Sequence, residues 1–220
     1  MEDTANFHPA VVILDMDGLM LDTESLMIPL WAKAGRAFGY EITPQMVMRT
    51  LGINLEGTRA IIMSEFDSEF PYDKIRVELH RLYEEEIRKG ISHRPGLLPL
   101  LDHLASRSIP LAVATSTPRE LAVDKLRRAG ILERFVVLAC GDEVSHSKPA
   151  PDVFLLAARK LGKHPSECIG FEDSPAGLMA LHAAGIRSVF VKDLVEPPDE
   201  VLATVWRRFA DLAKAKILFP

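Results

Sequence analysis

Two aspartates separated by one residue, Asp15 and Asp17, directly follow the apolar run VVIL at positions 11–14. The β-branched run predicts a buried strand of a parallel sheet. Because side chains alternate along a strand, both carboxylates should point to the same side beyond its C-terminal end. Two carboxylates this close repel each other unless one keeps a proton or a cation lies between them. We expect Mg²⁺, which suits carboxylates together with water and a substrate phosphate.

Three later segments also end in polar groups that suit phosphate chemistry. A hydroxyl-rich loop follows the apolar run at 111–114, a lysine lies in a polar loop beside Pro149, and two acids end the run at 168–171. Because the carboxyl ends of parallel strands meet at one edge of the sheet, we expect these groups to converge on the first acidic pair. They are Thr115, Ser116, Lys148, Glu172 and Asp173.

Phosphoryl transfer offers a role for each group. A carboxylate at Asp15 can attack phosphorus and form an aspartyl-phosphate, and Asp17 can act as acid and then base if its pKa is raised. Lys148 supplies a fixed positive charge for the phosphate. Thr115, Ser116 and the turn at Gly18 are expected to bind phosphoryl oxygens, and the candidate metal ligands are Asp15, Asp17, Glu172 and Asp173.

Each of these groups also has a structural explanation when it is considered alone. Aspartates such as Asp15 and Asp17 are common in turns, and Thr115 can be an ordinary hydroxyl at the end of a strand. Lys148 fits a solvated loop, and the pair Glu172-Asp173 fits the start of a helix. The agreement among four strand ends is what favours a catalytic site.

The order of the predicted elements indicates an α/β fold with a helical insertion. Helical patterns cover 24–38, 44–52, 55–66 and 71–89, where Ile75, Leu79, Leu82 and Ile87 form an apolar stripe, and no strand pattern interrupts them. We therefore predict a Rossmann-like parallel sheet core in residues 1–24 and 91–220, with a helical cap in residues 25–90 inserted after the first strand.

The remaining core pattern alternates strands and helices. Strands are predicted at 110–114, 135–139, 168–171 and 188–191. One helix should turn Leu97, Leu98, Leu101 and Leu104 inward, and the next should be capped by Thr117. A last helix is expected around 200–216, and Leu178 and Leu181 should face the core.

Composition narrows the class of protein. The chain has 220 residues, 48% hydrophobic and 26% charged, with a net charge of −5, so neither nucleic acid nor an anionic membrane is an expected partner. Cys140 and Cys168 have no metal-site or redox spacing and fit buried hydrophobic positions. With no signal peptide pattern and no apolar stretch approaching ~20 residues, we expect a cytoplasmic protein. The sequence predicts no oligomeric state.

Four segments together resemble the haloacid dehalogenase superfamily, in particular its phosphatase and β-phosphoglucomutase-like members: DMDGLMLDTE, ATST, SKPAPDVF and GFEDSPAG. The resemblance spans essentially the whole chain. It implies a Rossmann-like core with a helical cap, Mg²⁺ dependence and an aspartyl-phosphate on Asp15. It also implies that Asp17 is the acid-base residue, that Lys148 and Thr115 belong to the site, and that Glu172 and Asp173 lie at the metal.

Departures from the mutase pattern favour hydrolysis. The position of the mutase's hinge histidine is Met27 here, and those of the lysine and arginine that hold a second phosphate are Leu51 and Leu55. Arg49 and Arg59 lie nearby without matching. Water is therefore the expected acceptor, in a phosphatase acting on a small phosphorylated metabolite, with sugar phosphates as candidates and a β-phosphoglucomutase-like mutase as the alternative.

Other reactions of this fold and a non-enzymatic protein fit less well. Dehalogenation would leave Asp17 without a role, and phosphonate hydrolysis would need a cap lysine in a special setting, which Lys33 lacks. A receiver-type phosphorylation switch also uses acids, a hydroxyl and a lysine around Mg²⁺. It places its phosphoacceptor on a middle strand and has no room for the helical insertion.

The cap is expected to contact the substrate, and it should open and close about linkers near 23–26 and 90–95. Met27, Trp31, Arg49 and Asn54 are the candidates to face the core, although Met27 and Trp31 also fit ordinary helix packing.

Overall fold

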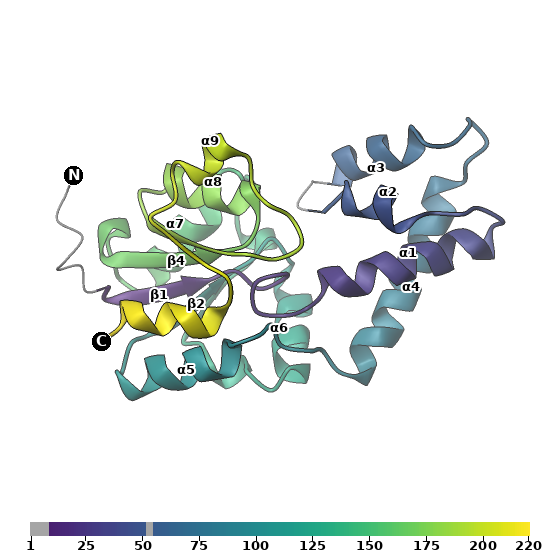
Figure 1. Ribbon diagram of the computed structural model, residues 1–220. Coiled ribbons are helices and arrows are strands. Elements are labelled where there is room, and N and C mark those ends of the chain that lie inside the picture. Colours follow the sequence, from purple (N-terminus) through teal and green to yellow (C-terminus); the bar gives the residue numbers. More distant parts are fainter. Residues whose placement is uncertain (1–8, 52–54) are drawn as a thin grey trace.

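The structure is a computed structural model and describes residues 9–51 and 55–220 (Figure 1). Its centre is a six-stranded parallel sheet in the order β3-β2-β1-β4-β5-β6. The order reverses direction between β1 and β4, which is where doubly wound sheets open a crevice for ligands. The strands are β1 (Val11–Leu14), β2 (Leu111–Ala114), β3 (Val137–Ala139), β4 (Cys168–Glu172), β5 (Arg187–Val191) and β6 (Arg207–Phe209).

Helices cover both faces of this sheet. They are α5 (Leu97–Ser106), α6 (Arg119–Arg128), α7 (Asp152–Lys160), α8 (Pro175–Ala183) and α9 (Asp199–Leu202), with short 3₁₀ turns η2 (Leu132–Arg134), η3 (Gly141–Glu143), η4 (Pro165–Glu167) and η5 (Leu212–Leu218). Together with the sheet order they confirm the predicted α/β Rossmann-like fold.

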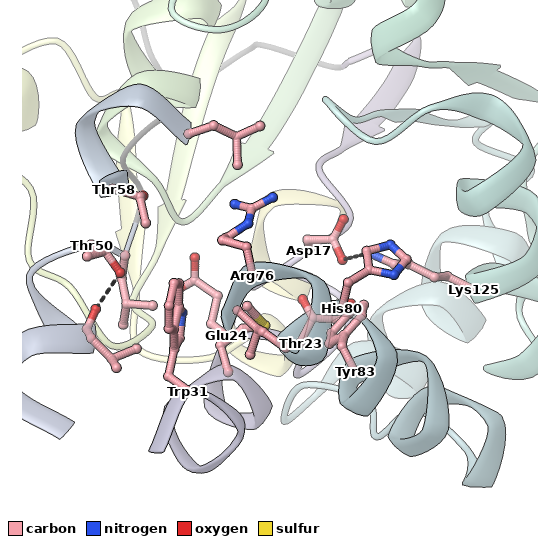
Figure 2. Close-up of a pocket in the computed structure, with 15 residues that line it drawn as sticks. Asp17, Thr23, Glu24, Trp31, Thr50, Thr58, Arg76, His80, Tyr83 and Lys125 are labelled. Atoms are coloured by element: carbon pink, nitrogen blue, oxygen red, sulfur yellow. Dashed lines mark hydrogen bonds and ion pairs between the residues drawn. The ribbon is translucent and has the colours of Figure 1, made fainter. Parts of the chain in front are cut away.

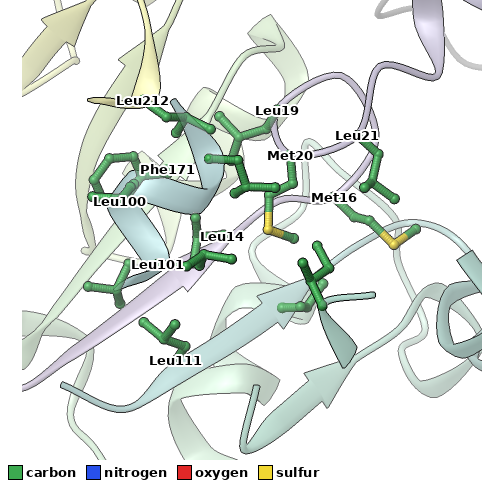
Figure 3. Packing of buried hydrophobic residues seen from close by; sticks show 14 of the residues in the cluster. Leu14, Met16, Leu19, Met20, Leu21, Leu100, Leu101, Leu111, Phe171 and Leu212 are labelled. Atoms are coloured by element: carbon green, nitrogen blue, oxygen red, sulfur yellow. The ribbon is translucent and has the colours of Figure 1, made fainter. Parts of the chain in front are cut away.

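The central strand is apolar throughout because it is buried on both faces. Val12 and Leu14 pack into a cluster with α5 that includes Leu100 and Leu101 (Figure 3), whereas Val11 and Ile13 pack into a second cluster under α7 and α8. All four side chains are at most 1% exposed. Burial on both faces fixes the end of β1, and therefore the place where Asp15 begins, within the middle of the sheet.

The helices α1 (Glu24–Ala37), α2 (Pro44–Met48), α3 (Leu55–Met63) and α4 (Tyr72–Lys89) follow β1 and lie beyond its C-terminal end (Figure 1). They have their own apolar cluster, in which the predicted positions Ile75, Leu79 and Leu82 are buried. The two connections to the core run side by side, since Asp22 N donates to Ser92 O at 2.9 Å and Arg94 N donates to Met20 O at 2.9 Å.

Three local predictions were wrong. The expected helix at 200–216 is instead α9, β6 and η5, because the backbone of β5 would otherwise be an unpaired sheet edge and β6 pairs with it. Leu98 is 40% exposed, and Leu100 takes the inward position in α5. Thr117 does not cap α6, which begins after Pro118 without a side-chain cap. Both cysteines are buried and free, as predicted.

Within the described ranges, no helix is both long and apolar enough to cross a membrane.

Candidate active site

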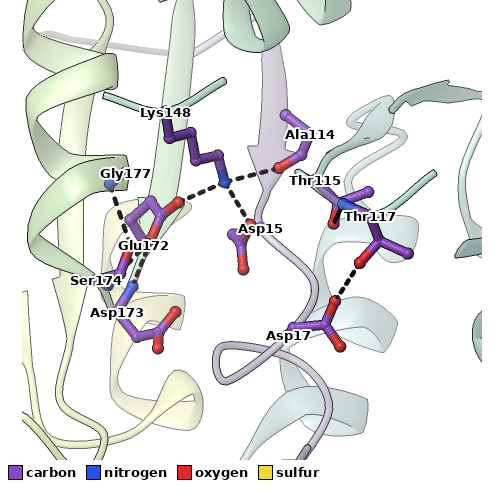
Figure 4. Close-up of polar contacts among 10 residues, drawn as sticks. All are labelled: Asp15, Asp17, Ala114, Thr115, Thr117, Lys148, Glu172, Asp173, Ser174 and Gly177. Atoms are coloured by element: carbon purple, nitrogen blue, oxygen red, sulfur yellow. Dashed lines mark hydrogen bonds and ion pairs between the residues drawn. The ribbon is translucent and has the colours of Figure 1, made fainter. Parts of the chain in front are cut away.

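Lys148 joins groups from three strand ends at the crevice (Figure 4). Its ammonium donates to Asp15 Oδ1, to Glu172 Oε1 at 2.6 Å and to Ala114 O at 3.1 Å. The Lys148 side chain is only 7% exposed. A buried ammonium is tolerated when acceptors replace its water, and here two carboxylates and a carbonyl do so. The structure therefore places three of the predicted site residues in direct contact.

Glu172 is completely buried, and both of its carboxylate oxygens accept hydrogen bonds. While Oε1 accepts from Lys148, Oε2 accepts from the backbone N–H groups of Asp173 and Ser174 and from Ser174 Oγ, each at 3.0 Å. A Cβ atom on Gly177, in the first turn of α8, would lie 1.8 Å from Glu172 Oε1. Glu172 thus positions both Lys148 and the start of α8. This position of the carboxylate requires glycine at 177, because any Cβ atom there would overlap it.

Three carboxylates could hold a cation together: oxygen atoms of Asp15, Glu172 and Asp173 all lie within 4.8 Å of one another. Asp173 Oδ1 is buried and has no hydrogen-bond partner within residues 9–51 and 55–220. Because an unpaired buried carboxylate oxygen is costly, a hard cation fits this position. Glu172 is already saturated by donors, so Asp15 and Asp173 are the better ligands.

The predicted phosphate-binding turn at Gly18 contacts this cluster differently from expectation. Gly18 has φ +89°, and a Cβ atom there would lie 2.4 Å from Asp173 Oδ2. Its N–H already donates to Leu21 O at 2.9 Å. Gly18 therefore makes room for Asp173, and its amide is occupied within the turn.

The cluster carries more negative than positive charge. Burial, with the charge of Glu172 adding to it, raises the pKa of Asp15 to about 8 even though Lys148 opposes the shift. Burial and the charges of Glu172 and Asp15 raise the pKa of Asp173 well above its usual range. A bound cation would remove this excess, which is a second reason that the site fits Mg²⁺.

Asp17 lies outside the three-carboxylate cluster and has its own partners. Oδ1 accepts from Lys125 Nζ at 2.7 Å, and Oδ2 accepts from Thr117 Oγ1 at 2.7 Å. Burial favours the neutral form, but Lys125 and the hydrogen bonds outweigh it, so the net pKa of Asp17 is lowered. The raised pKa that the acid-base role requires is therefore absent in the free protein, because the charge that balances Asp17 is a lysine of α6 that the sequence analysis did not consider.

One feature of the sequence could have indicated the role of Lys125. This lysine occurs between Ala122 and Leu126 on the apolar face of α6, where a lysine is unusual, and it is among the few buried charged residues of the described chain. Its ammonium also lies 5.3 Å from the centre of the Tyr83 ring of α4. Lys125 therefore connects the acid of the first motif to the helical insertion.

The two predicted hydroxyls of the second motif differ in exposure. Thr115 is 1% exposed, and its Oγ1 accepts from the N–H of Thr117 at 3.0 Å. Ser116 is exposed in the loop between β2 and α6. Both lie at the same sheet edge as Asp15, so the structure brings the motif to the crevice.

A cavity of about 350 Å³ begins at Asp17 and extends beneath α1–α4 (Figure 2). The predicted residues Met27 and Trp31 line it. Arg49 instead forms an ion pair with Glu65 at 2.5 Å, and Asn54 lies outside the described residues. The sequence analysis missed Glu24, Arg76 and His80, which also line the cavity.

The family follows from comparison with known proteins. Residues 12–191 match the model of the haloacid dehalogenase-like hydrolases. The chain belongs to this family, as its four motifs predicted. It is 30% identical over 179 residues to a phosphorylated carbohydrates phosphatase of Thermotoga maritima, covering 81% of this chain and 83% of the relative. It is 31% identical over 188 residues to the fructose-1-phosphate phosphatase YqaB of Escherichia coli, covering 83% and 96%.

A solved structure supports the same assignment. The CbbY protein of Rhodobacter sphaeroides in complex with phosphate has a TM-score of 0.75 and 25% identity, covering 94% of this chain and 96% of that chain. The β-phosphoglucomutase of Clostridium difficile shares the fold, with a TM-score of 0.72. Since the named relatives are phosphatases, the chain is a phosphatase of this family, a hydrolase of phosphate monoesters, and this assignment is better supported than the mutase alternative.

Proposed function

We propose that the protein is a Mg²⁺-dependent phosphatase that hydrolyses a small phosphorylated metabolite through an aspartyl-phosphate on Asp15. The observation that carries the proposal is the contact of Lys148 with both Asp15 and Glu172, beside the unpaired Oδ1 of Asp173. This arrangement holds one carboxylate beside a buried positive charge at a position suited to a phosphate and a metal. Asp15 and Asp173 would hold Mg²⁺, which when bound offsets phosphate charge so that an anionic nucleophile can approach.

In the first step an Asp15 carboxylate oxygen attacks phosphorus and the bond between phosphorus and the alcohol oxygen breaks. Lys148 fixes Asp15 through Oδ1, which leaves Oδ2 as the attacking atom. Thr115 and Lys148 would stabilise the charge on the phosphoryl oxygens. The leaving alcohol oxygen takes a proton from Asp17, whose carboxylate lines the cavity that would hold the alcohol.

Asp17 is ionised in the free protein, so it must gain a proton when substrate binds. A phosphate dianion beside Asp17 opposes the effect of Lys125 and raises the pKa of the carboxylate. In the second step Asp17 removes a proton from water, the water oxygen attacks phosphorus, and the bond between phosphorus and the Asp15 oxygen breaks, which releases inorganic phosphate and restores the Asp15 carboxylate. Both steps use one carboxylate alternately as acid and base.

Three observations support hydrolysis of a small substrate. Leu51 and Leu55, at the positions of the mutase's phosphate-binding pair, line the cavity as apolar side chains. Lys33 is exposed and does not line it, so phosphonate chemistry has no imine-forming residue there. A cavity of about 350 Å³ is at the lower end of the range of ~300–1,000 Å³ typical of small-molecule sites.

The domain division remains part of this proposal. Residues 25–90 would act as a cap that opens for substrate and closes during reaction, with the rest of the chain as the catalytic core. A sugar phosphate is the candidate substrate, in line with the names of the two phosphatase relatives. A cytoplasmic location is the accompanying prediction.

The test is release of inorganic phosphate from p-nitrophenyl phosphate and a panel of phosphomonoesters, with Mg²⁺ present or chelated. The wild-type protein should be active only with Mg²⁺, and Asp15→Asn should abolish turnover. Glucose 1-phosphate with a bisphosphate activator, followed for glucose 6-phosphate, tests the mutase alternative. Efficient isomerisation, or activity that survives both chelation and Asp15→Asn, would contradict the proposal.

A further inference from the structure

Two side chains of opposite charge line the cavity without contacting each other. Glu24 is the first residue of α1, and Arg76 lies in the N-terminal half of α4. Figure 2 shows both directed into the cavity, with Arg76 between Glu24 and Asp17. Within the described residues, neither side chain forms a hydrogen bond or an ion pair. The gap between them is therefore open to a ligand.

Glu24 lies between the three-carboxylate cluster and the cavity. One of its carboxylate oxygens is within 4.8 Å of oxygens of Asp173 and Asp193, and the residue also lines the cavity with Asp17. An alcohol whose phosphate is at Asp15 and which extends past Asp17 into the cavity has Glu24 on the cavity wall. The position of Glu24 is thus suited to the first carbons of the leaving group.

The charges around the cavity balance one another. Asp17 and Lys125 form an ion pair at 2.7 Å, so Glu24 and Arg76 remain as one carboxylate and one guanidinium, and a leaving group of either charge would approach one group of its own sign. A neutral group with many hydroxyls has no such conflict, because each hydroxyl both donates to a carboxylate and accepts from a guanidinium. The rest of the wall is largely apolar, with Met27, Trp31 and Leu55 available to pack against carbon.

We propose that Glu24 and Arg76 determine specificity by hydrogen bonding to hydroxyl groups of a neutral polyhydroxylated leaving alcohol, Glu24 as acceptor and Arg76 as donor. This inference rests on the proposed phosphatase function and adds the chemistry of the alcohol and the two residues that select it. A site built to hydrogen-bond hydroxyls discriminates strongly against an analogue lacking them, because its polar groups are then left unpaired.

The test compares glucitol 6-phosphate with n-hexyl phosphate, which has the same chain length without hydroxyls. The wild-type protein should show a kcat/KM for glucitol 6-phosphate higher by about 100-fold or more. Glu24→Gln and Arg76→Met should each reduce this ratio by about tenfold or more. Phosphoglycolate, whose leaving group is anionic, should be a poor substrate that improves in Glu24→Gln.

Two matched controls lie outside the cavity: Glu200→Gln, in the first turn of α9, and Arg88→Met, near the end of α4. Both should leave the ratio unchanged. A binding readout independent of turnover is the Kd of the two phosphates for the Asp15→Asn protein, where Glu24→Gln and Arg76→Met should weaken only glucitol 6-phosphate.

The outcomes separate the two proposals. If the wild-type protein hydrolyses none of the phosphomonoesters, the phosphatase function fails and the inference fails with it. If it hydrolyses p-nitrophenyl phosphate but prefers n-hexyl phosphate, or if both variants keep the wild-type ratio in turnover and in binding, the inference alone is overturned.

Discussion

Lys125 Nζ lies 2.7 Å from Asp17 Oδ1, while Lys148 contacts Asp15, so each aspartate of the first motif has a separate lysine. The expected repulsion between the two carboxylates is therefore relieved by two ammonium groups from different elements. Only Asp15 belongs to the three-carboxylate cluster that fits a metal. This division separates the proposed nucleophile from the proposed acid-base residue electrostatically.

The first prediction concerns Lys125→Met, which removes the charge that lowers the pKa of Asp17. Because a neighbouring cation lowers a carboxyl pKa by roughly 1–3 units, the variant should shift the basic limb of the pH profile of kcat/KM for an alkyl phosphate to higher pH by about one unit or more. The effect should be smaller for p-nitrophenyl phosphate, whose leaving group needs little protonation. Lys89→Met, at the exposed end of α4, is the control. A basic limb at the same pH as in the wild-type protein would show that Lys125 does not control the pKa of Asp17.

The second prediction concerns Glu172→Gln. The amide of Gln has one acceptor oxygen and one NH₂ donor. It therefore cannot accept from both Lys148 and the N–H groups of Asp173 and Ser174, because its NH₂ would face one of these donors. Leaving one buried group unpaired should lower the free energy of unfolding by about 1–3 kcal/mol, measured by urea denaturation. Misplacement of Lys148 should lower kcat about 100-fold or more.

Gly177→Ala tests the same contact from the other side, because its Cβ would displace the Glu172 carboxylate. Glu133→Gln, at an exposed position, should leave stability and kcat unchanged. Wild-type kcat in both Glu172→Gln and Gly177→Ala would show that the contact between Glu172 and Lys148 is dispensable.

The third prediction links pH, metal and stability. In the folded metal-free protein the pKa of Asp15 is about 8, whereas an aspartate in the unfolded chain has a pKa of about 3.9. Between these two pH values Asp15 carries a proton in the folded protein and has lost that proton in the unfolded chain. Since the folded state then binds more protons than the unfolded state, stability should fall as the pH rises from about 5 to 8. Mg²⁺ replaces the proton, so its stabilising effect should grow over the same range.

Thermal unfolding at pH 5.5, 7 and 8.5, with Mg²⁺ or with a chelator, measures this effect. The increase in Tm on adding Mg²⁺ should be largest at pH 8.5 and should be lost in Asp173→Asn. A Tm increase of equal size at every pH would mean that protons and the metal do not compete at Asp15.

Much of this architecture could be predicted because it depends on local patterns. The buried run at Val11–Leu14 and the apolar stripe of α4 reflect periodic burial, and the four motifs coincide with strand ends in the sheet. Lys125 and Arg76 could not be predicted in the same way. Each is a single charged residue in an amphipathic helix. Arg76 of α4 and Lys125 of α6 line the same cavity only because α4 packs against the core. The prediction of a C-terminal helix was wrong for a similar reason, since β6 forms by pairing with the edge strand β5.

The last prediction concerns the apolar wall formed by Leu51 and Leu55. A mutase must retain a bisphosphate, and this wall offers no charge to hold a second phosphate. The double variant Leu51→Lys/Leu55→Arg supplies two donors that bind phosphate strongly. It should therefore be inhibited by glucose 1,6-bisphosphate with a Ki at least about tenfold lower than that of the wild-type protein, equivalent to about 1.4 kcal/mol of binding free energy. Val77→Arg, which places a cation at a position 73% exposed on α4, should leave the Ki unchanged because it does not line the cavity. If the double variant and Val77→Arg lower the Ki equally, general charge rather than the cavity wall controls binding of the second phosphate.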